Sequence, residues 1–436
     1  MTDIIFSFDT EDFTSNIAAD AILAEAEIMR QEGVRAGFCI VGLLAKQLKV
    51  WGRDDILEAL GHHDILSHSY GHTVHPTINE YTDIDNFEDA HNEVIRQETE
   101  GIKLINEFTG GMKIYGACPP GNQKSYVAMY AYADMGLPIY ADTVCDTTDG
   151  QGVYCCNIYQ AKYSYFLEKL IDDISEDEMK KDLDELSKMK RVIVFSHPNN
   201  ALFTESWDEV NYYKENYCEF GQWKECRRRP VEQTERFYKN IRKFVRLIKA
   251  DERFNITSYK EMEEMLSKQG ERIIKKEDFP LIKKHLEKEF EPMNTPVSIS
   301  LADMFLAAKD MLLGEEQHLC GKVYGFLDTP YSITAPVTLN KSDIIKSAES
   351  IDTQKFLPVS INVGGNVIGP ADWLRAAVAI VCGDDEVTVT PSPQLPSLDA
   401  IPRLKTLSLM GWMQSDSFED KYLSERLRLQ TWTVRF

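Results

Sequence analysis

The sequence lacks long hydrophobic runs. No stretch of about 18 consecutive apolar residues occurs in its 436 residues, and the mean hydropathy is −0.33, which excludes the pattern of a membrane-spanning helix. Its first residues carry neither the basic n-region nor the apolar h-region of a signal peptide. Nine cysteines are scattered without the spacing of a disulfide framework. We therefore expect reduced thiols and a cytoplasmic protein.

Positive charge is also scarce. Lys and Arg number 48 against 70 Asp and Glu, which gives a net charge of −22. A surface this acidic repels phosphate backbones and anionic lipid, so we expect neither nucleic acid nor a membrane as a partner. Glycine-rich phosphate loops, dinucleotide fingerprints and nucleophile elbows are absent from the sequence. Apolar residues make up 43%, enough for packed cores, and the length predicts two or three domains.

Short apolar runs alternate with helical patterns over residues 1–268. The predicted strands are Ile4–Phe8, Ala36–Val41, Asp64–Ser67, Ile114–Ala117, Pro138–Asp142, Val192–Ser196 and Asn255–Thr257. The predicted helices are Ala18–Gln31, Phe87–Phe108, Tyr126–Met135, Ser164–Lys188, Thr234–Lys249 and Tyr259–Ser267. This alternation predicts an α/β domain with a mostly parallel sheet, open or closed into a barrel.

The remaining sequence has a different composition. Residues 269–296 are rich in Lys and Glu and end in a Pro-containing segment, which predicts a charged helix followed by an exposed linker. Residues 297–436 contain an internal duplication, because Ser300–Gly314 matches Gly369–Gly383. Each copy predicts an N-capped amphipathic helix ended by glycine. We expect a smaller accessory domain here, mostly helical or α+β, whose two repeat helices pack together and which carries no catalytic residue.

Two histidines lie four residues apart, directly after a predicted strand. His68 and His72 follow Asp64–Ser67, and on one helical turn this spacing would place both imidazoles on one face, able to bind one metal ion. The carboxyl end of a strand is where α/β folds build their sites. A solvated histidine-rich loop is the alternative interpretation.

Acidic residues and a third histidine follow two other predicted strands. Asp9, Glu11 and Asp12 come after Ile4–Phe8, and they would repel one another unless a cation or a shared proton relieved them. A loop that caps the next helix is the alternative. His197 leaves the strand Val192–Ser196, which makes it a candidate acid or base, although a lone histidine there is usually structural.

The order of these motifs resembles the polysaccharide deacetylase (NodB-homology) family over about residues 1–265. The motifs are Asp9 and Asp12 after the first strand, Gly33–Gly42, Gly61–His68, His68 with His72, Ala117-Cys-Pro119-Pro120-Gly121, and Ser196-His197-Pro. The resemblance implies a distorted (β/α) barrel that binds a divalent metal, with zinc expected. It implies a metal-dependent hydrolase of C–N (amide) bonds that removes acetyl from an N-acetylated sugar or glycan.

The same resemblance assigns roles to residues. Asp12, His68 and His72 would be the metal ligands, with Glu11 as the alternative to Asp12, and Asp9 would be the general base and His197 the general acid. Zinc polarises a carbonyl and activates water, and a carboxylate and a histidine suit the two proton transfers.

The sequence also departs from the family pattern. The arginine that normally begins the third motif and orients the catalytic aspartate is replaced by Ala117, and Lys124 or Arg35 could take its place. Four further residues could support the site or contact the substrate: Pro119, Pro120, Asp142 and Trp207. A helix-capping role is the alternative for Asp142. The aromatics of the segment 198–223, Trp207, Tyr212, Tyr213, Tyr217 and Trp223, could stack on a sugar, with packing beneath a long loop favoured.

Three alternatives remain open. The first is an allantoinase-like hydrolase of a small cyclic amide or ureide, which the lack of an export signal and of the third-motif arginine favours. The second is an inactive metal-binding domain that recognises glycans. The third concerns residues 297–436, which weakly resemble pseudomurein-binding-type repeats and could instead serve as a scaffold or homo-oligomerisation domain.

Overall fold

The computed structural model describes residues 1–121, 123–142, 149–214, 218–352, 355–397 and 413–436. The chain forms two compact units. The first contains Met1–Gly152, Gln160–Lys268 and, among the described residues near the C-terminus, 413–423. The second contains Val153–Tyr159, the described residues of 269–407, and Ser424–Phe436.

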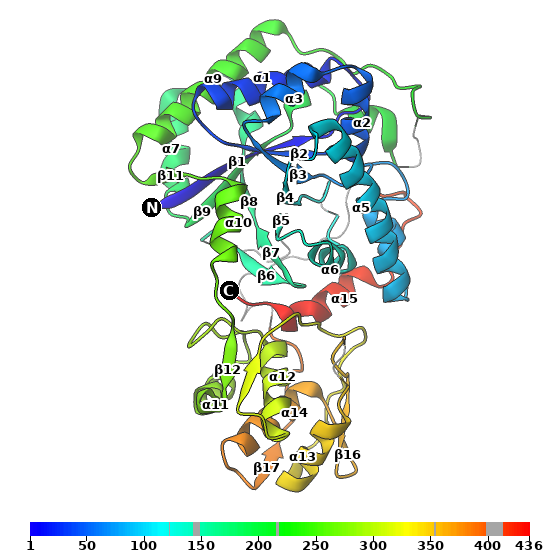
Figure 1. Ribbon diagram of the computed structural model, residues 1–436, viewed down its shortest axis with the longest axis vertical. Coiled ribbons are helices and arrows are strands. Elements are labelled where there is room, and N and C mark those ends of the chain that lie inside the picture. The colour runs from blue at the N-terminus through cyan, green and yellow to red at the C-terminus, as the bar shows by residue number, and fades with distance from the viewer. Residues whose placement is uncertain (122, 143–148, 215–217, 353–354, 398–412) are drawn as a thin grey trace. The chain divides into compact units, whose positions relative to one another are not determined.

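The first unit is built on a mostly parallel sheet with helices outside it (Figure 1). Its strands are β1 (Thr2–Thr10), β2 (Gly37–Ile40), β3 (Asp64–Ser67), β4 (Ile114–Ala117), β5 (Ile139–Ala141), β7 (Ile158–Ala161), β8 (Tyr163–Phe166), β9 (Arg191–Ser196) and β11 (Phe254–Ile256). Their order is β7-β5-β4-β3-β2-β1-β9-β8, and β11 also pairs with β1. Strands β1 to β5, β7 and β9 are mostly buried, as expected for strands covered on both faces, whereas β8 and β11 are partly exposed.

Helices connect these strands. They are α1 (Ala18–Gln31), α2 (Gly42–Val50), α3 (Asp54–Leu60), α4 (Ile78–Thr82), α5 (Phe87–Thr109), α6 (Tyr126–Asp134), α7 (Glu176–Leu186), α8 (Trp207–Tyr212), α9 (Val231–Ala250) and α10 (Tyr259–Ser267). Two 3-10 helices, η1 (Leu167–Ile171) and η2 (Pro198–Ala201), flank β9. In Figure 1, α1, α3 and α9 lie together on one side of the sheet, and α5 and α6 lie on another.

The sheet curls upon itself. Four strands separate β4 from β8 in the sheet order, which in a flat sheet would be about 24 Å. Yet the hydroxyl of Tyr163, at the start of β8, lies 2.9 Å from Sγ of Cys118, which directly follows β4. The predicted α/β fold with a distorted barrel and a second, smaller domain is therefore confirmed. Among the described residues, no pairing joins the edge strand β8 to β7, so the barrel is not closed by a strand ladder.

Most predicted elements of the first unit match the structure, with one clear error. The predicted helix Ser164–Lys188 is wrong, because its first part forms β8 and η1, and only Glu176–Leu186 is α-helical. Tyr163 and Tyr165 project from β8 into packed surroundings, where they stack on Phe195 and Phe244 respectively. Tertiary packing of these aromatics, which favour strands, overrides the helical pattern.

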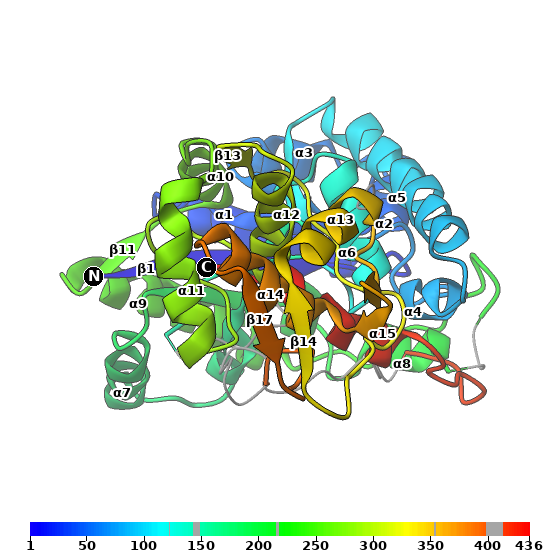
Figure 2. The same ribbon diagram turned by 90° about the horizontal axis from the view of Figure 1, so that it is seen from below.

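The second unit has its own core and an α+β composition. Its elements are β6 (Val153–Cys155), β12 (Ile273–Lys275), η3 (Lys276–Asp278), α11 (Phe279–Lys288), α12 (Leu301–Leu312), β13 (Gln317–Leu319), β14 (Val337–Asn340), α13 (Lys341–Ser350), β15 (Ile361–Val363), β16 (Asn366–Ile368), α14 (Pro370–Val381), β17 (Glu386–Val389), α15 (Leu423–Leu429) and η4 (Gln430–Thr433). Its sheets are two-stranded and antiparallel, as β14 and β17 show side by side in Figure 2.

The two repeat helices pack together, as predicted. The rings of Phe305 in α12 and Trp373 in α14 are 4.6 Å apart between centroids. Ser300 caps α12 through a reciprocal capping box with Asp303.

The segment 269–296, predicted as a charged helix and an exposed linker, contributes more buried residues to the second unit than expected. Ile274, Phe279 and Ile282 belong to the core of the second unit, and Met293 is buried and pairs with Ile299, whereas residues 294–296 are exposed. Independent folding of residues 297–436 stays a prediction.

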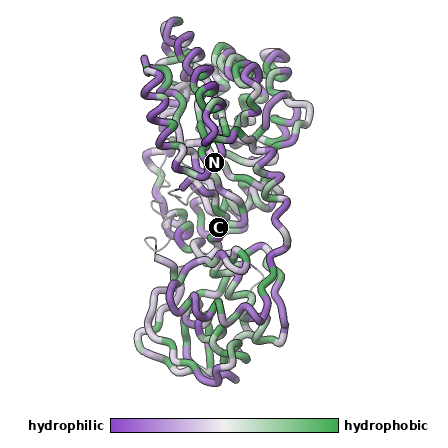
Figure 3. Tube along the Cα trace, turned by 90° about the vertical axis from the view of Figure 1, so that its left-hand side faces the viewer, coloured by the Kyte–Doolittle hydropathy of each residue, from purple (hydrophilic) through white to green (hydrophobic). Residues whose placement is uncertain are grey.

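Hydrophobic and hydrophilic residues alternate along the helices of both units (Figure 3). Within the described part of the chain, no helix combines the length and the apolar character needed to cross a lipid bilayer. The predictions about cellular compartment, partners and oligomeric state stay predictions.

Candidate metal centre

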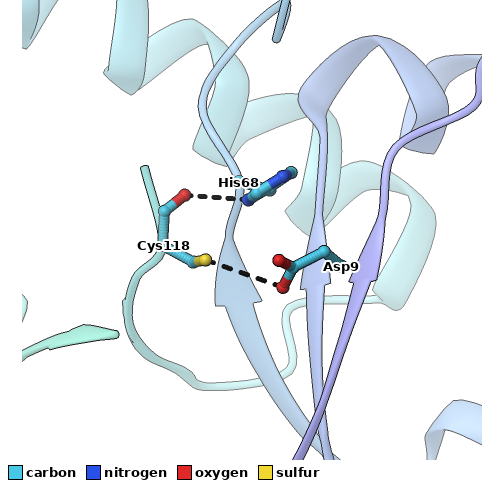
Figure 4. Close-up of side chains that lie close together, drawn as sticks. All are labelled: Asp9, His68 and Cys118. Atoms are coloured by element: carbon cyan, nitrogen blue, oxygen red, sulfur yellow. Dashed lines mark hydrogen bonds between the residues drawn. The ribbon is translucent and has the colours of Figure 1, made fainter. Parts of the chain in front are cut away.

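The predicted site residues leave the sheet at one edge. Asp9 lies near the end of β1, His68 directly follows β3, Cys118 directly follows β4, and His197 directly follows β9. Parallel strands share their carboxyl edge, so these four side chains start from neighbouring positions. The curl of the sheet then brings them together, as Figure 4 shows for Asp9, His68 and Cys118.

The histidine pair lies in a loop and not on a helix. Ser69 and His72 adopt left-handed backbone conformations, with φ of 67° and 55° respectively, and the His72 amide donates to Oγ of Ser69. The two imidazole centroids are nevertheless 5.1 Å apart. The helical-turn explanation of the spacing is therefore wrong, whereas the convergence of the two rings is as expected.

Close backbone packing fixes this loop. The first amides of α2, those of Gly42 and Leu43, donate to the carbonyls of Ser69 and Tyr70. A Cβ on Gly101 of α5 would lie 2.9 Å from Cα of Tyr70, so only glycine allows α5 to approach so closely. Glu98, one turn earlier in α5, accepts a hydrogen bond from the Tyr70 amide. Two helices thus position the histidine loop.

Glu11 completes a buried cluster with the two histidines. Its Oε2 lies 2.8 Å from Nε2 of His72 and 3.6 Å from Nε2 of His68. All three residues are buried, and each offers one ligand atom within 4.8 Å of the others. Burial alone would raise the pKa of Glu11, but His72, His197 and His68 lower it well below its usual range. A carboxylate and two imidazoles converging in a buried site fit a divalent metal such as zinc.

Two members of this cluster, His68 and Glu11, are each oriented by a second group. Nδ1 of His68 lies 2.9 Å from the Cys118 carbonyl, so it carries the proton and leaves Nε2 as the free acceptor. Nδ1 of His72 lies 3.9 Å from the buried carboxyl of Asp208 and has no hydrogen-bond partner among the described residues. The indole of Trp207 donates to Oε1 of Glu11 at 3.1 Å. Such partners are typical of metal ligands.

Asp12 lies outside this cluster. Its Oδ1 accepts hydrogen bonds from the amide and the hydroxyl of Thr14, at 2.9 and 2.6 Å. Burial raises the pKa of the Asp12 carboxyl to about 7, against the lowering effect of the bonds from Thr14. The structure therefore brings Glu11, the alternative ligand, to the histidines, and places Asp12 in a turn at the start of the next connection.

Asp9 belongs to a second group that could hold a metal, together with His68 and Cys118 (Figure 4). Its Oδ1 accepts hydrogen bonds from the Tyr163 hydroxyl at 2.9 Å and from the Cys118 thiol at 3.6 Å. Burial raises the pKa of the Cys118 thiol well above its usual range, which keeps it protonated. The Glu11 group brings one carboxylate and two imidazoles together, a donor set typical of zinc sites, and we therefore treat it as the candidate metal site.

His197 lies beside Asp9. Its Nε2 is 3.9 Å from Oδ2 of Asp9, and its Nδ1 is 2.9 Å from Oε1 of Glu168. The same Glu168 oxygen accepts a hydrogen bond from the backbone amide of His197. Burial would lower the pKa of His197, but Glu11, Glu168 and Asp9 raise it well above its usual range. With 27% of its side chain accessible, His197 is the most exposed member of this group. It can therefore carry a proton at a position that solvent reaches.

The other predicted candidates have structural partners. Lys124 lies 3.8 Å from Asp142, whose backbone pairs with Ala161. Arg35 forms an ion pair with Asp64 at the amino ends of β2 and β3, whereas the site lies at their carboxyl ends. Pro119 and Pro120 are buried in the turn after β4. Neither basic residue therefore takes the place of the expected arginine.

The aromatics of the segment 198–223 mostly pack beneath it. Trp207 is fully buried against Phe13, and Trp223 donates to the hydroxyl of Tyr212 at 2.7 Å. Tyr213 is 43% exposed, and Tyr217 lies outside the described residues.

Sequence reasoning missed four residues of the site: Cys118, Tyr163, Glu168 and Asp208. Cys118 stood within a quoted motif and could have been found there. Glu168 lies in a segment predicted as a helix, Asp208 lies in a predicted loop, and Tyr163 precedes the predicted helix in a segment assigned to no element. Nothing in the spacing distinguishes them from surface acids and core tyrosines.

No family model matches the chain, and no curated protein matches it significantly. Solved structures resemble it in shape at low identity. A protein described as a putative polysaccharide deacetylase from Mycobacterium smegmatis has a TM-score of 0.41 at 12% identity, covering 61% of this chain and 89% of that one. A family 4 carbohydrate esterase from Streptomyces lividans gives 0.31 at 12% identity, with 59% and 91% covered. The PuuE allantoinase gives 0.40 at 12% identity, with 60% and 89% covered. We rest the chemistry of the site on its own geometry.

Proposed function

We propose that the protein is a metal-dependent hydrolase of C–N (amide) bonds that deacetylates an N-acetylated sugar or glycan. The observation that carries this proposal is the buried convergence of Glu11, His68 and His72 beside Asp9 and His197. A carboxylate base and a histidine acid next to one metal site are the groups that hydrolysis of an amide requires.

Glu11, His68 and His72 would hold the divalent ion, with zinc as the expected metal. When bound, such an ion polarises a carbonyl group and lowers the pKa of water towards neutrality. Glu11 takes the place that the sequence assigned first to Asp12, because its Oε2 faces both imidazoles, whereas Asp12 is engaged by Thr14. Glu11→Gln should therefore lose the metal in elemental analysis, and Asp12→Asn should retain it. The reverse result would restore Asp12 as the ligand.

Asp9 and His197 supply the two proton transfers. Oδ1 of Asp9 is held by Tyr163, so Oδ2 is the atom available to take a proton from the attacking water. Nδ1 of His197 is held by Glu168, which leaves Nε2 to protonate the departing nitrogen. Both free atoms face the same space, 3.9 Å apart. A substrate nitrogen and a water molecule bound there would each find its proton-transfer group.

A small substrate is the second candidate. The ligand side chains are buried, with Glu11 8% and His72 5% exposed, and this favours a compact cyclic amide or ureide over a long polymer. An inactive domain that binds metal and glycan is the third. The accessory residues 297–436 carry none of the proposed ligands or proton-transfer groups, and we propose that they serve glycan binding or assembly.

The test compares substrates on the zinc-loaded full-length chain. We expect acetate release from N-acetylglucosamine oligomers, and its loss in His68→Ala/His72→Ala together with the metal. His62→Ala is the matched control, because His62 is an exposed histidine of the same stretch. This variant should leave acetate release and metal content unchanged. Hydrolysis of cyclic amides or ureides without acetate release would favour the second candidate. Full metal content with neither reaction would favour the third.

A further inference from the structure

The hydroxyl of Tyr163 lies at the centre of a buried polar cluster inside the curled sheet. Four side chains surround it, and they come from β1, from β2 and from the turn after β4. The distances are 2.9 Å to Oδ1 of Asp9, 2.9 Å to Sγ of Cys118, 3.3 Å to Oγ of Ser7 and 3.7 Å to Sγ of Cys39. A second tyrosine, Tyr259, reaches the same cluster through Ser7 at 3.0 Å.

The direction of the key hydrogen bond follows from the chemistry of its partners. A carboxylate only accepts, so the Tyr163 hydroxyl donates to Asp9, and the Cys118 thiol donates to the same oxygen. Burial, with Asp9 and Cys118, raises the pKa of the Tyr163 hydroxyl well above its usual range, so it stays a donor. The ring is held by stacking on Phe195, with centroids 4.5 Å apart.

These two donors bind Asp9 in a chain that lacks the arginine expected at position 117. Ala117 stands where an arginine was expected to orient Asp9, and its methyl group cannot donate. Among the described residues, no Arg or Lys nitrogen lies within 4.0 Å of Asp9, and His197 is the basic group recorded there. Arg35 and Lys124 bind other acids.

We propose that Tyr163, assisted by Cys118, is the positioning residue of Asp9 and replaces the missing arginine with neutral donors. This inference rests on the proposed function, in which Asp9 is the base. By fixing Oδ1, the two donors direct Oδ2 towards the space that it shares with Nε2 of His197. A rigidly held base keeps its position relative to the reacting water. A small displacement of such a base lowers the reaction rate strongly.

The experiment uses Tyr163→Phe in the full-length chain, which removes only the hydroxyl. We expect unchanged zinc content and KM, and a kcat lowered about 10- to 100-fold, the range for losing a hydrogen bond to a charged group. Tyr165→Phe is the matched control, because Tyr165 lies on the same strand and donates to the remote Asp182 at 2.7 Å. Its kcat should stay within about twofold of the wild type.

Cys118 offers a second, independent pair of variants. Cys118→Ala should lower kcat, and Cys118→Ser, which retains a donor, should restore part of the activity that Cys118→Ala loses. This pair tests the inference even if the Tyr163 variant does not fold.

The rates of all these variants are measured with 4-nitrophenyl acetate, a small chromogenic substrate, and with the sugar oligomers.

A crystallographic readout separates this inference from the proposed function. In crystals of Tyr163→Phe we expect the Asp9 carboxylate to leave the position that it holds in the wild type, whether or not the protein hydrolyses any substrate tested. An unmoved Asp9 with unchanged kcat would overturn the inference. Loss of zinc in Tyr163→Phe would also overturn it, because the Asp9, His68 and Cys118 group would then be part of the metal site. Absence of wild-type hydrolysis with a displaced Asp9 would overturn only the proposed function.

Discussion

The indole nitrogen of Trp207 donates a hydrogen bond to Oε1 of Glu11, at 3.1 Å, and so leaves Oε2 of Glu11 facing His72 at 2.8 Å. The indole is fully buried and packs against Phe13 and the ring of His72. A residue from the segment after β9 therefore orients a carboxylate at the end of β1. The burial of Trp207 and its bond to Glu11 favour a supporting role for this side chain over contact with a substrate.

Trp207→Phe should weaken metal binding, because it keeps an aromatic ring but removes the hydrogen bond to Glu11. We expect the zinc affinity to fall about 10- to 100-fold, the usual cost of losing a partner of a metal ligand. Competition with a chromogenic chelator measures this. Trp223→Phe, which loses only the bond to Tyr212, is the control and should leave the affinity unchanged. Equal affinities for the two variants would argue against a role for Trp207.

Gly101→Ala should disturb the histidine loop from outside the site. The new Cβ would lie 2.9 Å from Cα of Tyr70, a backbone atom that moves only with the loop. Overpacking of this kind costs about 1–3 kcal/mol, and we expect lower thermal stability together with weaker zinc binding. At Gly270 an added Cβ meets no atom within 4 Å, so Gly270→Ala is the control. An unchanged melting temperature and zinc affinity in Gly101→Ala would contradict the close packing described here.

Glu25 should make the stability depend on pH. This residue of α1 is fully buried, neither carboxyl oxygen has a hydrogen-bond partner among the described residues, and burial raises its pKa well above the usual range. Because the folded pKa exceeds the unfolded one, the stabilising contribution is complete below the unfolded pKa and is lost as pH rises through the folded pKa.

Glu25→Gln carries no such dependence, since its amide does not titrate. The stability of this variant relative to the wild type should therefore increase between about pH 5 and about pH 8, by about 1 kcal/mol or more. Urea denaturation at several pH values measures this. Glu27→Gln is the control: Glu27 is bound by Arg30, which lowers its pKa, so its trend should be small and opposite. A flat difference for Glu25→Gln would show that Glu25 is ionised at low cost.

Asp9→Asn should separate catalysis from metal binding. Asp9 lies beside the metal cluster but outside it, so the variant should keep a full equivalent of zinc while turnover falls on the order of 10²–10⁴. Elemental analysis and initial rates on one preparation provide both numbers. If zinc is lost instead, Asp9 is a ligand, and the roles of Asp9 and Glu11 must be exchanged.

The framework of the site could be predicted from the sequence because short apolar strands and the polar residues that follow them are local signals. β3 and β4 have the predicted bounds, and Asp9, His68 and His197 leave the sheet at the predicted edge. The histidine pair was found by its spacing, although the structure joins the two rings through left-handed residues and not through a helix.

The choice between Glu11 and Asp12 could not be made in the same way. It depends on which carboxylate faces the histidines after the chain turns, and on Thr14, which engages Asp12. The role of Tyr163 also depends on the curl of the sheet, which brings β8 opposite Cys118. Contacts across a curled sheet join residues distant in sequence, and no local pattern records them.

We propose that Glu11, His68 and His72 together hold one divalent metal ion. Anomalous diffraction at the zinc absorption edge, from crystals of the full-length chain grown with zinc, tests it most directly. We expect a single strong peak within coordination distance of the Glu11 carboxylate and both imidazoles. A peak at Asp9 and Cys118, a peak at Asp12, or no peak near His68 and His72 would contradict it.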